Sequence, residues 1–310
     1  MGALNNSMWN VAAGSSFTPT LRGLYAFGAV CCWGKTNISS LVSTSGVISS
    51  DVTGVGSARS NVAACTYGGD KGIFCYGNTA PARTTLVNLV SNQGVVASDG
   101  AGAGTATNGS RACSYGVGKG IKAYGWTAGP LNESNLISDE GVVASSITGV
   151  GTTRFMPMAA AYGEDKGIFG FGDNQYTPKY GMTNLVSNVG VVGSDVSAVG
   201  TARSQGGACS YGEDKAIFAY GTTGTITAIS NLVSNSGVVA SDVSGVGSAR
   251  SDGVGGVGYD SDKGIFAFGT ISGYTGISNL VSSSGVVASD TAAVGTARSS
   301  QGGGVGYSTS

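Results

Sequence analysis

The sequence predicts an all-β fold, a six-bladed β-propeller with four antiparallel strands in each blade. Three observations support this prediction: a glycine-valine signature recurs at nearly constant spacing, each repeat contains four short strand-like runs, and the two ends of the chain carry complementary halves of one repeat. Repeats of this length are typical of stacked or radial arrays, in which one small sheet cannot bury its own faces and its neighbours must cover them.

The signature is Gly-Val-Val, or Gly-Val-Ile in the first copy, and it recurs at intervals of 48, 47, 49, 47 and 48 residues. Its glycines are Gly46, Gly94, Gly141, Gly190, Gly237 and Gly285. The repeats, called units below, occupy nearly all of the 310 residues. We therefore expect one propeller domain over residues 21–310, preceded by a leader or anchor segment over residues 1–20.

Each unit divides into four candidate strands. In one unit the first is a run of small residues ending at Tyr162, and the second is Gly-Ile-Phe-Gly-Phe-Gly at 167–172. The third is Asn-Leu-Val-Ser at 184–187, and the fourth is the signature from Gly190 onwards. Gly, Asn, Ser and Asp separate these runs, which favours strands joined by tight turns, and no helical period is present. We expect the glycine-rich first strand at the crowded axis of the ring.

The two ends of the chain complete each other. Residues 21–28 match the second strand of a unit, whereas residues 301–310 match the first strand and then stop. We expect the C-terminal run to pair with the N-terminal strands, because this pairing closes the ring and removes its exposed sheet edges.

Composition excludes several functions. Only 11% of the residues are charged, against roughly 25% in typical soluble domains. The 16 basic and 17 acidic residues nearly cancel, so there is no electrostatic basis for binding nucleic acid or anionic lipid. No apolar stretch is long enough to span a membrane, and no secretory signal is evident. We expect cytoplasmic synthesis without membrane insertion.

The six cysteines include three that share one position in their units, namely Cys65, Cys113 and Cys209. Other units have alanine or valine there, which predicts a small buried site. Cys65 and Cys75 flank a predicted turn, and the sequence leaves open whether a disulfide joins them. The chain contains no histidine. We therefore expect no imidazole base, no metal site, no cofactor and no enzymatic activity.

The run from Thr-Ala-Arg-Ser through an apolar strand to Asp-Lys-Gly-Ile-Phe-aromatic-Gly resembles a kelch repeat over about residues 21–308. It is more weakly similar to the regulator-of-chromosome-condensation repeat. The arrays of Asn-Leu-Val-Ser-Asn-x-Gly-Val-Val-Ala-Ser-Asp are also similar to uncharacterised repeat proteins of tailed phages and environmental bacteria. These resemblances imply a β-propeller, with a location on a virion or outside a cell.

Charged residues recur at fixed places in the units. Aspartate stands at 51, 99, 195, 242 and 290, where one unit has Ser146, and arginine stands at 59, 154, 203, 250 and 298, where one unit has Thr107. The two exceptions fall in consecutive units. We therefore expect each arginine to pair with the aspartate of the next unit, both partners being lost together in one pair. In the turn between the first and second strands of a unit, a lysine stands beside an aspartate, and we expect this lysine to stabilise the turn.

The connection between the second and third strands varies most between units. The distance from the glycine that ends the second strand to the signature glycine ranges from 16 to 18 residues. In an up-and-down blade all six of these connections lie on one face. Either they bind a partner there, or their sequences vary because nothing constrains them. The candidate binding residues in them are Trp33, Asn78, Trp126, Asn132, Asn174, Gln175, Tyr176, Tyr180 and Tyr274.

Two functions fit these observations. The first is a non-enzymatic binding module, a phage virion protein such as a tail fibre or an extracellular adhesin, whose variable loops recognise a receptor that is a glycan or a surface protein. The alternative is a purely structural protein that packs against other subunits of a particle or filament. Association between copies of the chain is compatible with either function.

Overall fold

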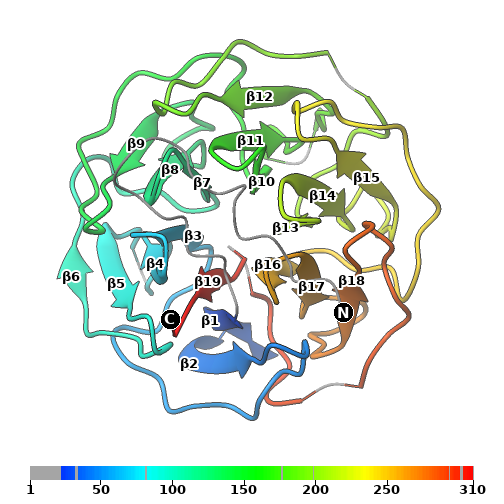
Figure 1. The fold of residues 1–310 in the computed structure, drawn as a ribbon. Coiled ribbons are helices and arrows are strands. Elements are labelled where there is room, and N and C mark those ends of the chain that lie inside the picture. Colours follow the sequence, from blue (N-terminus) through cyan, green and yellow to red (C-terminus); the bar gives the residue numbers. More distant parts are fainter. Residues whose placement is uncertain are drawn as a thin grey trace, which may run out of the picture.

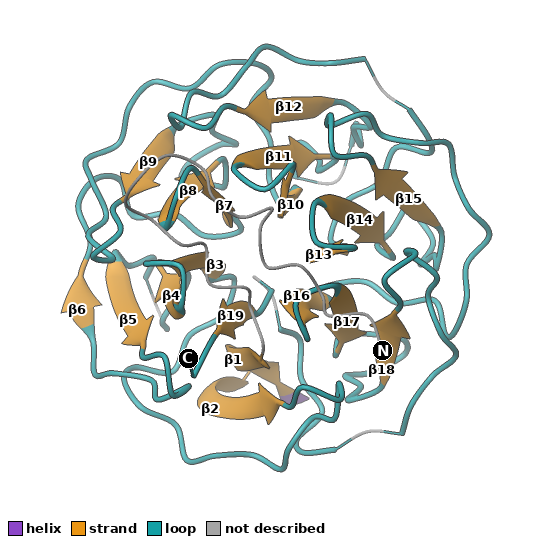
Figure 2. Ribbon diagram, viewed as in Figure 1, coloured by secondary structure: helices purple, strands orange, loops and turns teal. Residues whose placement is uncertain are grey.

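The computed structural model describes residues 22–31, 34–80, 82–175, 177–197, 199–292, 294–300 and 303–309. The regular elements among these residues are nineteen strands, which form five three-stranded sheets and one four-stranded sheet. All pairings within the sheets are antiparallel. Figures 1 and 2 show the six sheets arranged around a common centre. The predicted all-β class is confirmed, and no helix in the described part of the chain could cross a bilayer.

The first strand of each unit is the innermost in Figure 1. These strands are β3 (Ala63–Tyr67), β7 (Arg111–Tyr115), β10 (Met158–Tyr162), β13 (Gly207–Tyr211), β16 (Gly255–Tyr259) and β19 (Val305–Tyr307). The middle strands are β4 (Lys71–Cys75), β8 (Lys119–Ala123), β11 (Lys166–Gly170), β14 (Lys215–Ala219), β17 (Lys263–Ala267) and β1 (Arg22–Val30). The outer strands are β5 (Leu86–Val90), β9 (Ser134–Ile137), β12 (Thr183–Val186), β15 (Ser230–Val233), β18 (Ser278–Val281) and β2 (Gly34–Val42).

Each inner strand contacts the inner strands of two neighbouring sheets. The contacting pairs are β3 and β7, β7 and β10, β10 and β13, β13 and β16, β16 and β19, and finally β19 and β3. Small side chains make this close approach possible, because glycine, alanine, serine and cysteine fill most inner-strand positions. The glycine-rich first strand therefore lies at the centre, as the sequence predicts.

The predicted pairing between the two ends of the chain is present. Strand β19 pairs antiparallel with β1, in a register that places Arg22 opposite Tyr307 and Leu24 opposite Val305. Val305 and Tyr307 are buried at 0% and 1% exposure. The sheet in the order β19-β1-β2 is therefore assembled from both ends of the sequence.

The fourth strand of each unit is less regular than predicted. Among the described residues only one sheet has a fourth strand, β6 (Gly100–Ala101), and in the other units the same segment makes isolated bridges. A side chain explains this difference. Asn184, in the third strand of a sheet without a fourth, donates from Nδ2 to the carbonyl of Gly193 at 3.0 Å, and Asn88 donates likewise to Ala97 before β6 begins, so a side-chain amide occupies the place of a backbone donor in both sheets. The backbone ladder is interrupted there, as in a β-bulge.

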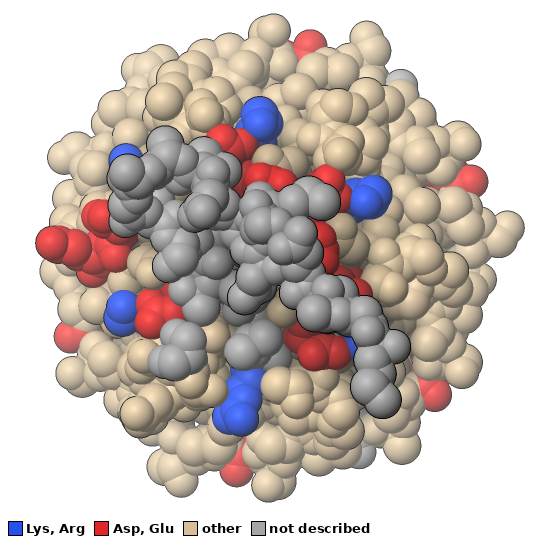
Figure 3. Space-filling model, in the orientation of Figure 1, with Lys and Arg blue, Asp and Glu red and all other residues tan. Residues whose placement is uncertain are grey.

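The turns between the first two strands and between the last two lie on the same face, as predicted. Asn235 of one such turn donates to Asp214 of another at 2.9 Å. The turn lysines form ion pairs with aspartates of their own turns, as Lys71 does with Asp70 at 2.9 Å. The ion pairs agree with the expected turn role, which stays a prediction, and Figure 3 shows charged side chains around the middle of this face.

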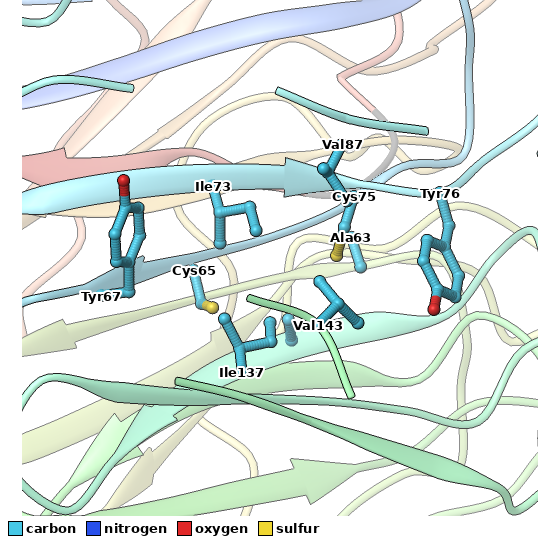
Figure 4. Packing of buried hydrophobic residues seen from close by; sticks show 10 residues of the cluster. Ala63, Cys65, Tyr67, Ile73, Cys75, Tyr76, Val87, Ile137 and Val143 are labelled. Carbon is cyan, nitrogen blue, oxygen red and sulfur yellow. The ribbon is translucent and has the colours of Figure 1, made fainter. Parts of the chain in front are cut away.

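The shared cysteine position is a small buried site, as predicted. Cys65, Cys113 and Cys209 are 2–4% exposed. Cys65 packs in a cluster that includes Ile137 and Val143 of the next sheet (Figure 4). Cys75 lies opposite Ala63 rather than Cys65 in the strand register, and both cysteines are free thiols. No disulfide therefore joins them.

Five arginines are fully buried between successive sheets: Arg59, Arg154, Arg203, Arg250 and Arg298. Each guanidinium lies over an aromatic ring of its own unit, at 3.9–4.2 Å from the ring centroid. Arg203, for example, stacks on Phe171 and donates from Nε to the carbonyl of Tyr220 in the following unit at 2.9 Å. Cation–π contact and hydrogen bond together join two sheets through one side chain.

The predicted pairing of arginine with the aspartate of the next unit is confirmed at two positions, Arg59–Asp99 at 3.7 Å and Arg298–Asp51 at 3.3 Å. The aspartates also accept hydrogen bonds from the residue two before the arginine. Ser57, for example, donates to Asp99 from its backbone N at 2.9 Å and from Oγ at 2.7 Å. Between the two consecutive units that lack these charges, Ser146 accepts the equivalent bond from the backbone N of Thr105 at 3.0 Å.

Lys122 compensates for the missing arginine at position 107. Its Nζ lies 4.3 Å from the centroid of the Tyr76 ring and donates to Thr107 Oγ1 at 3.0 Å. The side chain is 1% exposed, and burial lowers its pKa to about 8. Lys122 replaces the phenylalanine that four of the other units have at this place. A cation from another strand therefore restores the contact between the two sheets.

Candidate functional site

The candidate residues lie in the loops between the second and third strands. The loops 78–87, 126–134, 173–183, 222–230 and 270–278 follow strands β4, β8, β11, β14 and β17, at the end opposite the lysine turns. Of the candidates, Asn174 and Gln175 are exposed, while Asn78, Trp126, Asn132, Tyr180 and Tyr274 are partly buried. Trp33 and Tyr176 lie outside the described residues.

Trp126 is held by contacts on both its backbone and its ring. Its backbone exchanges hydrogen bonds with Asn108 at 2.9 and 3.3 Å. Its ring meets Phe155 edge-to-face, with centroids 5.7 Å apart and planes inclined at 65°. Phe155 in turn covers Gly109, where an added Cβ would lie 2.1 Å from the ring. The two aromatic side chains therefore have one defined arrangement, with part of Trp126 left accessible.

The neighbouring loop 173–180 stands on a buried polar cluster. Asp173 is 1% exposed, and its backbone exchanges hydrogen bonds with Phe155 at 2.8 and 3.0 Å. Its carboxylate accepts bonds from Ser204 Oγ at 2.6 Å and from the backbone N of Gln175 at 3.0 Å, and it lies 3.6 Å from Lys179 Nζ. These bonds fix the base of the loop, so Asn174 and Gln175 project from a rigid support.

The same cluster does not form a nucleophile. Lys179 Nζ donates to Ser204 Oγ at 3.0 Å, an arrangement that superficially suits base-assisted attack by the hydroxyl. Ser204 is fully buried, however, and its hydroxyl already donates to the Asp173 carboxylate at 2.6 Å. The cluster therefore positions the loop.

Trp126, Phe155, Asn174 and Gln175 form one continuous surface, called the Trp126 surface below. The continuity follows from the ring contact between Trp126 and Phe155 and from the backbone pairing of Phe155 with Asp173. It combines aromatic carbon with amide groups, which suits contacts with a sugar ring or with a protein side chain.

Other candidates have structural partners or lie in other loops. Asn132 donates from Nδ2 to the carbonyl of Gly151 at 2.8 Å. Asn78 exchanges backbone bonds with Ser60 at 2.8 and 3.1 Å, and its bridge with Arg83 closes its own loop. Tyr274 forms a bridge with Thr270 within the loop 270–278. The structure thus joins only part of the predicted set into one surface.

Sequence reasoning missed Phe155 because it compared the loops and not the residue that follows each arginine. The other units have serine or asparagine at this place: Ser60, Asn108, Ser204, Ser251 and Ser299. An aromatic residue among these small polar ones is the signal that could have identified it.

No family model matches this chain, and a search of curated proteins finds no relative of it.

Proposed function

We propose that the six sheets are the blades of a closed six-bladed β-propeller, with the outer segment of each unit serving as a shortened fourth strand. Two observations support closure. Strand β19 pairs with β1 and contacts both β16 and β3. Arg298 of the last unit also reaches Asp51 of the first, as Arg59 reaches Asp99 between adjacent units.

On this scaffold we propose a non-enzymatic binding module, carried on a virion or located outside a cell. The Trp126 surface recognises a glycan or a surface protein. The observation that carries this proposal is the contact of Phe155 with Trp126, which fixes the Trp126 ring. Beside it lies a loop with exposed amides, supported from below by the ion pair of Lys179 with Asp173. Recognition residues are usually placed on loops that a rigid scaffold supports, and a fixed aromatic ring loses little entropy on binding.

A glycan array and a panel of bacterial surface preparations test this function. The wild type is compared with Trp126→Ala and Asn174→Ala, and Lys71→Ala on the opposite face is the matched control. We expect at least tenfold weaker binding for Trp126→Ala, a smaller loss for Asn174→Ala and no change for Lys71→Ala. Equal binding by wild type and Trp126→Ala, or no binding to any sample, would overturn the proposal.

A second candidate function is assembly with other copies or subunits, and one observation favours it. The residue after each signature glycine is a valine that is 61–65% exposed: Val47, Val95, Val142, Val191, Val238 and Val286. The repetition places one exposed apolar side chain on every unit, which offers a second copy several equivalent contact points. If they mediate assembly, changing all six to serine will dissociate oligomers in analytical ultracentrifugation and leave binding by the Trp126 surface intact.

A further inference from the structure

A pocket runs along the centre of the molecule between the inner strands. It has a volume of ≈ 160 Å³ and is lined mainly by small residues of β3, β7, β10, β13 and β16. Arg111, at the start of β7, lies toward the end where the variable loops are. Glu164, Glu213 and Lys263 lie toward the turns at the other end. The two ends of the pocket therefore differ in chemical character.

Arg111 is the exceptional residue of this lining. The equivalent position, four residues before the tyrosine of the first strand, is Ala63, Met158, Gly207, Gly255 or Gly303 in the other units. Arg111 is only 6% exposed. An arginine that has replaced a small or apolar residue at a crowded centre is not required by the scaffold, because the other units assemble without it.

The guanidinium of Arg111 lacks a close counter-charge among the described residues. Nη1 donates to the carbonyl of Ser110 at 3.0 Å, and no carboxylate of the described residues lies within 4 Å of it. Asp252 interacts with it electrostatically at longer range. Burial lowers the pKa of Arg111 to about 10, so the group is still charged at neutral pH. A buried cation without a close counter-charge is unfavourable unless an anion joins it.

We infer that the central pocket binds a ligand bearing a carboxylate, with the carboxylate on Arg111. A guanidinium offers parallel N–H donors that match the two oxygens of a carboxylate. Arg111 is the one cation at its end of the pocket lining, since Lys263 lies at the other end and is paired with Asp260 at 2.5 Å. A single positive charge matches a monoanion better than the double charge of a phosphate monoester.

The dimensions limit the rest of the ligand. A cavity of roughly 150 Å³ accommodates a benzene-sized molecule, so the pocket of ≈ 160 Å³ holds a carboxylate with a short chain or one ring. Most other lining residues are glycine, alanine, serine and cysteine, which leave space and offer few charges. The carboxylate belongs to a free acid, to a uronic acid residue or to a peptide C-terminus.

Isosteric pairs of probes separate charge from shape. Calorimetric titrations compare butyrate with butyramide, glucuronate with glucose, and an N-acetylated dipeptide with its C-terminal amide. We expect at least tenfold tighter binding of the acid than of its neutral partner, and the pair with the tightest acid identifies the source of the carboxylate. Equal affinities within all three pairs would overturn the inference.

Two variants locate the charge that is responsible. Arg111→Met introduces the residue that another unit has at this position, and it should remove the preference for the acid. Arg83→Met makes the same change at an exposed arginine and should leave the preference unchanged. A preference that persists in Arg111→Met would contradict the assignment.

A measurement on the wild type covers the case in which Arg111→Met does not fold. The Arg111 Nε–Hε resonance should shift during titration with butyrate and stay in place with butyramide. An unchanged resonance with both probes would also overturn the inference. Because Trp126 is not part of the pocket lining, Trp126→Ala should retain acid binding, which separates this site from the proposed recognition surface.

Discussion

At the scale of single residues, side-chain volumes in one unit are complementary to those in the next. The Cys113 sulfur packs over Gly167 so closely that an added Cβ would lie 2.5 Å from it, and Cys209 covers Gly264 in the same way. The unit that has Ala160 in the cysteine position is followed by Ala216 in the glycine position, and the two pack in one cluster. A larger residue on one strand is therefore accompanied by a smaller one on its neighbour.

This matching gives a testable prediction. Gly167→Ala should lower the free energy of unfolding by about 1–3 kcal/mol, because the added methyl group overpacks the site against Cys113. The double variant Gly167→Ala with Cys113→Ala should recover most of the loss, because it reproduces the Ala160 and Ala216 pair. Gly129→Ala is the control, since no atom lies within 4 Å of its added Cβ. Chemical denaturation measures these proteins together with the single variant Cys113→Ala, and an additive double variant would disprove the matching.

The buried Lys122 predicts a pH dependence of stability. Burial lowers its pKa to about 8 in the folded protein, against ~10.4 in an unfolded chain. Between these values the unfolded state binds more protons, so this group makes the free energy of unfolding rise with pH. The full change is about 3 kcal/mol, since one pKa unit corresponds to roughly 1.4 kcal/mol.

Lys122→Met removes this titration while keeping the volume of the side chain similar. The stability of wild type minus that of Lys122→Met should increase between pH 7.5 and pH 10.5. The contribution of most buried cysteines and tyrosines is common to both proteins and cancels in the difference, whereas that of Cys75 is coupled to the charge of Lys122. A difference that stays constant with pH would show that Lys122 has an ordinary pKa.

At the scale of elements, the contacts between each aspartate and the arginine segment of the preceding unit are repeated five times. Partial burial alone would raise the pKa of Asp242, but hydrogen bonds from Thr201 and Asn231 and the charge of Arg203 outweigh it and lower the pKa. Thr201 donates to Asp242 from both its backbone N and its hydroxyl. The ionised aspartate thus holds a loop of the preceding unit against the outer segment of its own.

A double-mutant cycle tests whether this contact contributes to the free energy of unfolding. Arg203→Met and Asp242→Asn should each destabilise the protein, and their effects should be coupled by about 1 kcal/mol or more, because each variant removes the partner of a buried or partly buried charge. Arg203 with Asp290 is the control pair, since Asp290 accepts its bonds from Ser248 in another unit. Equal coupling in both pairs, or none in either, would refute the role of the contact.

Sequence reasoning identified the strands whose patterns are local. Tyr162, the run 167–172 and Asn184 mark strands that the structure contains, because each strand is read from its own residues and flanking turns. It could not foresee the interrupted fourth strand, since that depends on where the Asn88 side chain points. Lys122 was missed for a similar reason. It takes over the role of the arginine that other units have at the position of Thr107, fifteen residues earlier, and only the fold brings the two positions together.

The candidate surface was predictable only in part. Loop variability correctly marks Trp126 and Asn174 as belonging to variable connections on a constant frame. The partners that hold these loops, Phe155 and Asp173, were absent from the prediction, because a residue that supports a loop is recognised only by its contacts. Arg111 lies in a strand, so a search confined to loops could not reach it.

At the scale of the whole molecule, the sheet assembled from both ends of the chain lies between its neighbours as the other sheets do. Arg298 stacks on Phe268 at 3.9 Å and reaches Asp51, which repeats the contacts of the other arginines. Strand β19 contacts β16 on one side and β3 on the other. The contacts that join successive units therefore also join the last unit to the first.

Removal of residues 303–310 tests this arrangement. The truncation exposes the edge of β1 and removes the buried side chains of Val305 and Tyr307, each worth about 1.5–3 kcal/mol. We expect a fall in Tm of roughly 10 °C, taking about 2–4 °C for each kcal/mol lost. A synthetic peptide of residues 299–310, added in trans, should restore the Tm, because the rest of β1 still presents the complementary edge. A peptide with Val305→Ser and Tyr307→Ser should fail to do so. If the truncated chain keeps its Tm, or if both peptides act alike, the two ends do not hold the molecule together, and the sheets form an open array instead of a ring.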